Sequence, residues 1–303
     1  MLCLSQVSRK RNLGLCRSVT TLSLARMTSS FDWEDIVGRS WADMYAQTDR
    51  SFAGLTQRLL ERISPLPGEA VLDIGCGAGE LALAIARARP RAEVIGLDVS
   101  AHLLAAARDR SVSRETPTFE LGDAATWSQP GFTPDLLVSR HGVMFFDDPV
   151  AASAHLHAIA TPQARMAFSC FRSPRDNRWA TDLGEMLGLP PADPANPGPF
   201  AFADPQRVEA ILTAAGWGHI DFEPVDYAYI AGMGADPIGE AAAFFARIGP
   251  AAAPLRELEG AARDKLEMRL IAWLEAHRSG DMVAFGAGAW IVTAQADRRS
   301  RIR

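Results

Sequence analysis

Short apolar runs alternate with Ala- and Leu-rich segments along most of the chain. The apolar run at 71–74 is followed by three alternate glycines and by the segment 80–89, which has the composition of a helix and ends before Pro90. Continuous apolar runs are typical of strands that are buried on both faces of a parallel sheet. The pattern therefore predicts an α/β fold. Strands are predicted at 71–74, 94–98, 118–123, from 134 into the loop that contains 139–146, at 165–171, 219–225 and 285–294.

The turn after the first predicted strand contains Gly75, Gly77 and Gly79. Glycine lets the backbone adopt a positive φ and lets a ligand approach the main chain without meeting a Cβ atom. The second predicted strand ends at Asp98, where a carboxylate suits a ribose diol in nucleotide-binding α/β folds. A dinucleotide-binding turn would have its third glycine at the position of Glu80. The spacing therefore disfavours a pyrophosphate site.

These motifs resemble those of the class I S-adenosylmethionine (SAM) dependent methyltransferases. In that family the first motif reads D-x-G-x-G-x-G, as it does here from Asp73, and the second strand ends in an acid, as it does here at Asp98. The resemblance covers about residues 33–294, and the segment 139–149 is similar to a type-11-like group that includes quinone-biosynthesis methyltransferases. It implies a Rossmann-like sheet of seven mostly parallel strands in the order 3-2-1-4-5-7-6, with helices on both faces and a helical cap.

The resemblance also implies a cofactor and roles for particular residues. SAM would be the cofactor, and its methyl group would pass to O, C or N of a small-molecule acceptor, giving S-adenosylhomocysteine (SAH). The glycine turn would face the methionine portion of SAM, and Asp98 would bind the ribose hydroxyls. Asp123 and the backbone of Ala124 would bind the adenine, and Leu103 would line its pocket. The expected cofactor-binding residues are Trp41, Tyr45, Asp73, Gly75, Cys76, Gly77, Gly79, Asp98, Val99, Leu103, Asp123, Ala124, Ala125 and Ser139.

The loop after the fourth predicted strand lies where open α/β sheets bind ligands. By its position, Arg140 or Met144 would face the acceptor. His141 is the candidate general base for a hydroxyl acceptor, because the unperturbed pKa of histidine lies near neutrality. An ordinary loop histidine is the alternative interpretation, and for Trp41 and Tyr45 the alternative is an aromatic stripe that packs on the core.

Composition and charge narrow the range of partners. The net charge of −5 argues against a nucleic-acid surface, which needs clustered basic residues. The four cysteines lack C-x-x-C spacing, and Asp147 and Asp148 before Pro149 are typical of a helix cap, so no metal site is predicted. No stretch approaches the about 20 apolar residues of a membrane span. We expect a cytoplasmic enzyme, and the near absence of lysine among the basic residues suggests a bacterial source.

The segments around the predicted sheet carry further expectations. Residues 1–30 are rich in basic and serine residues and contain no acid, so we expect a disordered tail from a mis-called start or, alternatively, a transit segment. Residues 31–303 would form the methyltransferase domain, beginning with a helical segment over 31–63. The stretches 172–206 and 226–284 are predicted to be cap insertions. A nucleotide-dependent oxidoreductase and a non-catalytic partner subunit of the same fold stay open as alternative functions.

Overall fold

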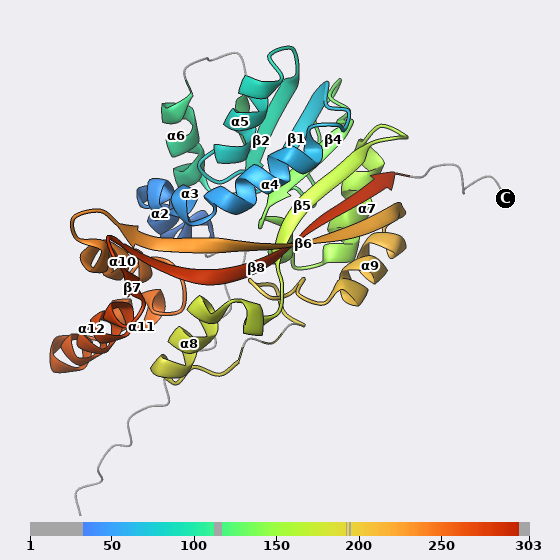
Figure 1. Ribbon diagram of the computed structural model, residues 1–303. Coiled ribbons are helices and arrows are strands. Elements are labelled where there is room, and N and C mark those ends of the chain that lie inside the picture. The colour runs from blue at the N-terminus through green and yellow to red at the C-terminus, as the bar shows by residue number, and fades with distance from the viewer. Residues whose placement is uncertain (1–32, 112–116, 192, 194, 297–303) are drawn as a thin grey trace, which may run out of the picture.

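A twisted sheet runs through the middle of the molecule in the computed structural model, which describes residues 33–111, 117–191, 193 and 195–296 (Figure 1). The strand order is β3-β2-β1-β4-β5-β8-β6, and a short strand, β7, pairs with β8. Strands β1 to β5 are parallel, whereas β8 runs antiparallel to both β5 and β6. The strands are β1 (Ala70–Ile74), β2 (Glu93–Asp98), β3 (Thr118–Leu121), β4 (Leu136–Arg140), β5 (Arg165–Phe171), β6 (Trp217–Met233), β7 (Arg278–Ser279) and β8 (Met282–Ala296).

The predicted fold class and strand order are confirmed. With β8 as the seventh predicted strand, the observed order is the expected 3-2-1-4-5-7-6, and the two-residue β7 is an addition to it. The predicted tail over 1–30 lies outside the described residues. Among the described residues, no helix is both long enough and apolar enough to cross a bilayer.

Helices cover both faces of the sheet. Helices α4 and α5 contact each other on one face, and α7 and α9 contact each other on the other (Figure 1). The helices are α2 (Ile36–Asp43), α3 (Tyr45–Ser51), α4 (Ala53–Ile63), α5 (Glu80–Ala88), α6 (Ala101–Arg110), α7 (Pro149–Ile159), α8 (Arg178–Leu187), α9 (Pro205–Ala214), α10 (Pro237–Phe245), α11 (Ala252–Glu257) and α12 (Gly260–Glu275), with short 3-10 helices at Val143–Phe145 and Pro174–Asp176.

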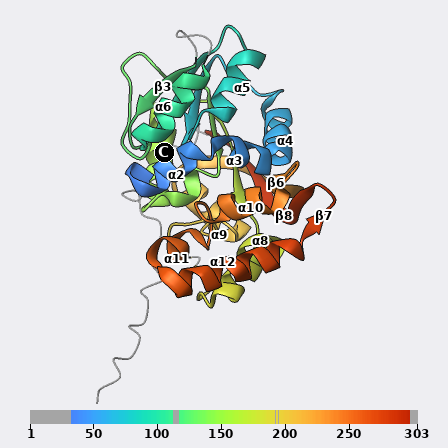
Figure 2. The same ribbon diagram turned by 90° about the vertical axis from the view of Figure 1, so that its left-hand side faces the viewer.

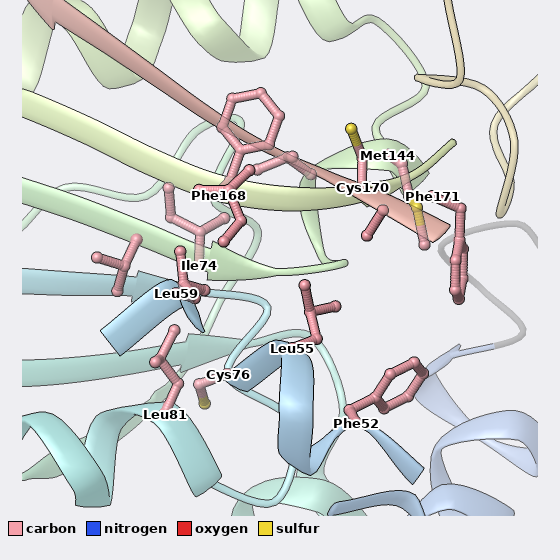
Figure 3. Packing of buried hydrophobic residues seen from close by; sticks show 14 of the residues in the cluster. Phe52, Leu55, Leu59, Ile74, Cys76, Leu81, Met144, Phe168, Cys170 and Phe171 are labelled. Carbon is pink, nitrogen blue, oxygen red and sulfur yellow. The ribbon is translucent and has the colours of Figure 1, made fainter. Parts of the chain in front are cut away.

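Helix α4 shows how the apolar pattern builds the core. Leu55, Leu59 and Ile63 recur every four residues, so they lie on one face of the helix, and all three are buried. Figure 3 shows Leu55, Leu59 and Ile74, the last residue of β1, as members of one buried cluster. Burying one such side chain contributes about 1.5–3 kcal/mol to stability. This face therefore holds α4 next to the glycine turn.

Within the described part of the helical segment predicted over 31–63, residues 36–63 are divided into α2, α3 and α4. The chain leaves helical geometry at Met44 and at Phe52, which join α2 to α3 and α3 to α4. Both side chains are buried, at 7% and 3% exposure. Packing of these two side chains into the core thus overrides a continuous helix.

The sixth predicted strand is longer than 219–225. Strand β6 continues to Met233 because Val225, Tyr227 and Tyr229 alternate with exposed residues, the period-2 pattern of a half-buried strand. The predicted insertion 226–284 therefore starts with a stretch of β6 and continues with α10, α11, α12 and β7. Helices α8, α10, α11 and α12 gather at one end of the molecule, away from α5 and α6 (Figure 2). That they form a substrate cap stays a prediction.

Helix α7 provides a local test of stability. The Asp148 carboxylate accepts hydrogen bonds from the backbone N–H groups of Val150 and Ala151, at 3.1 and 2.9 Å, and Pro149 occupies the first turn. Asp148→Ala should lower the free energy of unfolding by about 1 kcal/mol, because two N–H groups lose their acceptor. Urea denaturation followed by circular dichroism measures this. Asp147→Ala is the matched control, and an equal loss in both variants would contradict the assignment of Asp148 as the cap.

Candidate functional site

The glycine turn at the carboxyl end of β1 combines close packing with an open main chain. Gly75 and Gly77 have φ values of 63° and 56°, which favour glycine. A Cβ atom on Gly75 would lie 2.9 Å from the Cα atom of Gly142, so the turn touches the loop after β4. A Cβ atom on Gly77 would meet nothing within 4 Å. The backbone at Gly77 is therefore accessible to a ligand.

Asp98 connects this turn to the next helix. Its Oδ2 accepts a hydrogen bond from the Gly77 N–H at 2.9 Å, and its Oδ1 accepts one from the Ser100 N–H at 2.8 Å. Burial raises the pKa of the Asp98 carboxyl, and these two backbone donors act in the opposite direction. Because each carboxylate oxygen accepts more than one hydrogen bond, Asp98 keeps acceptor capacity for a ligand hydroxyl.

Asp73 is a second buried carboxylate at the same edge of the sheet. It is 1% exposed, and neither of its side-chain oxygens has a hydrogen-bond partner. Burial raises its pKa to about 7, although the positive charge of Arg140 and the nearby backbone N–H of Ala82 act to lower it. Buried polar groups in folded proteins nearly always have partners, so this orphaned carboxylate calls for a functional or structural explanation.

The residues expected around the adenine lie next to Asp98. The Gly122 N–H donates to the backbone carbonyl of Asp98 at 3.0 Å, which joins the ends of β2 and β3. Asp123 is exposed and accepts a hydrogen bond from the Ala125 N–H at 2.8 Å. Ser100 caps α6 and accepts from the N–H of Leu103. The other expected residues of this group, Cys76, Val99 and Ala124, are buried or partly buried.

The end of β4 is tied to the end of β1 by Ser139. Its hydroxyl donates to the Ile74 carbonyl at 2.7 Å and accepts from the Gly142 N–H at 3.0 Å. Met144, expected to face the acceptor, is 2% exposed. Both hydrogen bonds of Ser139 are made within the protein, so its role here is to join the glycine turn to the loop after β4.

His141 has an unusual environment. Its φ of 65° is uncommon for a residue other than glycine, and such backbone conformations cluster at functional sites. The imidazole stacks on Phe171 with ring centroids 4.1 Å apart, and neither ring nitrogen has a hydrogen-bond partner. Burial, together with the charge of Arg140, lowers its pKa to about 3. The pKa of His141 thus lies well below the unperturbed value of histidine, and the imidazole is neutral; its role as a general base stays a prediction.

Helices α2 and α3 lie across this region. Asp49 of α3 forms ion pairs with Arg110 at 2.8 Å and with Arg140 at 3.1 Å. Arg110 also donates to the carbonyl of Ala78 in the glycine turn. The Tyr45 ring lies 4.5 Å from the Arg110 guanidinium. Asp49 thereby links α3 to both loops of the site.

Trp41 belongs to an aromatic group rather than to an open face. Its ring centroid lies 5.3 Å from that of Trp33, which in turn lies 5.1 Å from Phe145 in the loop after β4. A Cβ atom on Gly38 would collide with the Ser100 side chain, so α2 packs closely on the start of α6. The ring contacts connect this group to the loop after β4, and the close packing at Gly38 places α2 beside Ser100, two residues after Asp98. Trp41 itself makes ring contacts within the protein.

Sequence reasoning missed three residues of this region, namely Phe52, Asp49 and Arg110. Asp49 and Arg110 lie in helices whose own sequence gives no sign of pairing, because the partners are about sixty positions apart. Phe52 lies within the helical segment predicted over 31–63, where an apolar side chain is typical of a core position. Their neighbours become visible only when the chain is folded.

Comparisons with known proteins agree with this geometry. Residues 71–163 match a family model described as a methyltransferase domain. Trans-aconitate 2-methyltransferase of Variovorax paradoxus (strain S110) is 33% identical over 137 residues, 45% of this chain and 49% of that protein. Nocamycin O-methyltransferase of Saccharothrix syringae is 29% identical over 171 residues, 55% of this chain and 60% of that protein. The chain thus spans about half the length of these curated relatives.

A solved structure gives the same result for the fold. A putative methyltransferase from Bacillus halodurans C-125 superposes with a TM-score of 0.53, covering 80% of this chain and 98% of that one. The two sequences are 14% identical. The likeness shows the fold alone.

Proposed function

We propose that this chain, which belongs to the class I SAM-dependent methyltransferases, transfers a methyl group from SAM to a small-molecule acceptor and releases SAH. One observation carries the proposal: Asp98 accepts a hydrogen bond from Gly77 while the main chain of Gly77 stays accessible. The ribose diol of SAM needs a buried hydrogen-bond acceptor, and its methionine portion needs a glycine backbone that no side chain covers. SAM is the cofactor.

The buried charges of the site fit SAM. SAM carries a positive sulfonium and a positive ammonium group, and Asp73 and Asp98 provide two buried carboxylates at the same sheet edge. Asp73 in addition lacks any hydrogen-bond partner. Cationic groups of a ligand would stabilise the ionised form of such carboxylates. The two buried carboxylates are therefore complementary in charge to the cationic groups of SAM.

The chain's own residues would bind and orient the cofactor. Asp98 would accept from the ribose hydroxyls, and the glycine turn would face the methionine portion. The adenine would lie against the segment that follows β2 and the loop that follows β3. Tyr45 and Trp41, on helices that cover this edge, would exclude water. The adenine-side residues of this proposal are Val99, Leu103, Asp123, Ala124 and Ala125.

The chemistry asks for orientation more than for an activated side chain. When bound, SAM supplies a methyl group that is already activated for displacement, so the protein mainly has to align the acceptor and keep water out. In its neutral form His141 can accept a hydrogen bond from an acceptor hydroxyl. Arg140 and Met144 would border the acceptor. The curated relatives are named for methylation of trans-aconitate and nocamycin, which supports a small-molecule acceptor.

Calorimetric titration separates this function from its alternatives. We expect the protein to bind SAM and SAH and not to bind NADH, because the glycine spacing lacks the pyrophosphate motif. Binding of NADH without SAM would identify a nucleotide-dependent oxidoreductase. Binding of neither ligand would identify a partner subunit without a cofactor. Transfer of labelled methyl groups to small molecules in a cell extract then tests the catalytic step.

A further inference from the structure

An aromatic cluster lies next to the loop after β4, and its members come from four separate parts of the chain. It consists of Phe52, His141, Phe171 and Tyr227. The Phe52 ring is central, with ring centroids 5.0 Å from His141, 6.1 Å from Phe171 and 6.4 Å from Tyr227. Figure 3 shows Phe52 at the start of α4 and Phe171 at the end of β5. Side chains from the loop after β4, from β5 and from β6 thus surround one phenyl ring.

The cluster contains polar atoms that the protein itself leaves without partners. Both ring nitrogens of His141 and the hydroxyl of Tyr227 are buried and have no hydrogen-bond partner. The two residues are 7% and 9% exposed. Orphaned polar atoms of this kind are costly in a folded protein and are explained when a ligand supplies the missing partner. His141 and Tyr227 border the same phenyl ring, so one ligand in its place could reach both.

The polar groups of the cluster are uncharged. Burial keeps the imidazole of His141 neutral by lowering its pKa to about 3. Burial raises the pKa of the Tyr227 hydroxyl, which therefore stays protonated. Together the two side chains offer one hydrogen-bond donor from Tyr227 and an acceptor nitrogen from His141.

The positive charge of Arg140, beside the cluster, is already balanced by a carboxylate. The Arg140 guanidinium lies 5.4 Å from the Phe52 ring centroid. It forms an ion pair with Asp49 at 3.1 Å and donates a hydrogen bond to the Thr56 hydroxyl at 2.9 Å. An anionic ligand at the cluster would lose its hydration without gaining a free positive charge. The environment therefore favours a neutral ligand over a carboxylate or a phosphate.

The Phe52 side chain fills the centre of the cluster, and its position in the chain allows it to move together with α3. It is the single residue between α3 and α4 and has non-helical geometry. Helix α3 is held across the site by side-chain ion pairs, those of Asp49 and that of Arg50 with Glu240 at 2.9 Å. The ion-paired side chains are 15–27% exposed, and the residues that α3 buries, Thr48 and Ser51, are polar, so α3 is held by polar contacts rather than by an apolar face. A shift of α3 would withdraw the phenyl ring and leave a space of aromatic shape.

We propose that the acceptor is an uncharged aromatic hydroxyl compound whose ring takes the place of Phe52 between Phe171 and Tyr227. Its oxygen accepts a hydrogen bond from the Tyr227 hydroxyl, and its hydroxyl hydrogen is donated to His141. This inference rests on the proposed methyl transfer. Tyr227 is then a specificity-determining residue for the acceptor, and it lies in a strand that carries no cofactor motif.

Three probes with one ring system test this inference: 2-naphthol, naphthalene and 2-naphthoate. Their affinities for the protein are measured by equilibrium dialysis, with and without saturating SAH. We expect 2-naphthol to bind more tightly than either of the others. Tyr227→Phe should weaken 2-naphthol by about fivefold and leave naphthalene unchanged, because one hydrogen bond is lost and the ring contacts remain.

Tyr229→Phe is the matched control. Its ring centroid lies 5.5 Å from that of Phe52, but its hydroxyl is already engaged by Ser51. Tighter binding of 2-naphthoate than of 2-naphthol would overturn the inference in favour of a carboxylate acceptor at Arg140. Absence of 2-naphthol binding, or equal 2-naphthol binding by the parent and Tyr227→Phe, would also overturn it. Failure to bind SAH would instead contradict the proposed function, and the series without SAH still tests the cluster.

Discussion

The Asp73→Asn variant should be more stable than the parent chain at pH 8, and its advantage should grow by about 3 kcal/mol between pH 5 and pH 8. The carboxyl of Asp73 is buried without a hydrogen-bond partner, and burial raises its pKa to about 7. In the unfolded chain this carboxyl ionises near its usual value, about 3.9. At pH values between these two pKa values, the carboxyl of Asp73 is therefore protonated in the folded state and ionised in the unfolded state.

The sign follows from proton linkage. Where the folded state binds more protons than the unfolded state, stability falls as pH rises. For Asp73 this loss begins near pH 4 and is complete just above pH 7. Asparagine has nearly the same shape as aspartate but does not ionise, so the stability of Asp73→Asn does not fall over this pH range. The lowered pKa of His141 acts in the opposite direction below about pH 6.5, but His141 is present in both proteins and its effect cancels in the comparison.

Urea denaturation of parent and variant at pH 5, 6, 7 and 8 measures the difference. Asp123→Asn is the control, because it makes the same substitution at an exposed carboxylate. A difference in stability that is independent of pH would contradict a raised pKa for Asp73.

The sheet could be predicted from the sequence because its signals are local. Each strand from β1 to β5 is a short apolar run that ends at a polar or glycine residue, and β5 was placed with the bounds that the structure gives, Arg165–Phe171. The end of β6 was predicted too early. Its continuation beyond Val225 alternates buried and exposed residues, and it is stabilised by pairing with β8, a contact that the local sequence does not contain.

The cofactor side of the site could also be predicted, because its residues follow consecutive strands. The glycine turn, Asp98 and Asp123 each lie at the carboxyl end of a parallel strand, and such ends meet at one edge of the sheet. Their roles toward SAM stay predictions. The sequence shows the order of these residues along the chain and that their types suit a nucleoside.

The acceptor side could not be predicted in the same way. Tyr227 lies in β6 and Phe52 between two helices, and their ring centroids lie 6.4 Å apart because α3 and α4 pack against β6. The pKa of His141 depends on burial by those same segments. Residues whose function depends on contacts between distant segments leave no periodic or motif signal, which is why the sequence indicated the cofactor and not the acceptor.

Asp98→Ala should weaken SAM binding by at least about tenfold, since about 1.4 kcal/mol corresponds to a factor of ten in affinity. Two hydroxyl donors of a ribose would lose a carboxylate acceptor, and charge-assisted hydrogen bonds contribute about 1.5–3 kcal/mol each. The same change also removes the acceptor of the Gly77 and Ser100 N–H groups. The glycine turn would then be less well ordered for the methionine portion as well.

Asp98→Asn separates these effects. Its amide oxygen can still accept from one backbone N–H, while the charge is lost and the amide nitrogen cannot accept at all. We therefore expect an affinity for SAM between those of the parent and Asp98→Ala. Titration calorimetry on variants that keep the parent's circular dichroism spectrum gives the dissociation constants, with the exposed Asp147→Ala as control. Should Asp98→Ala bind SAM like the parent while Asp147→Ala does not, the cofactor lies elsewhere and Asp98 only joins the glycine turn to α6.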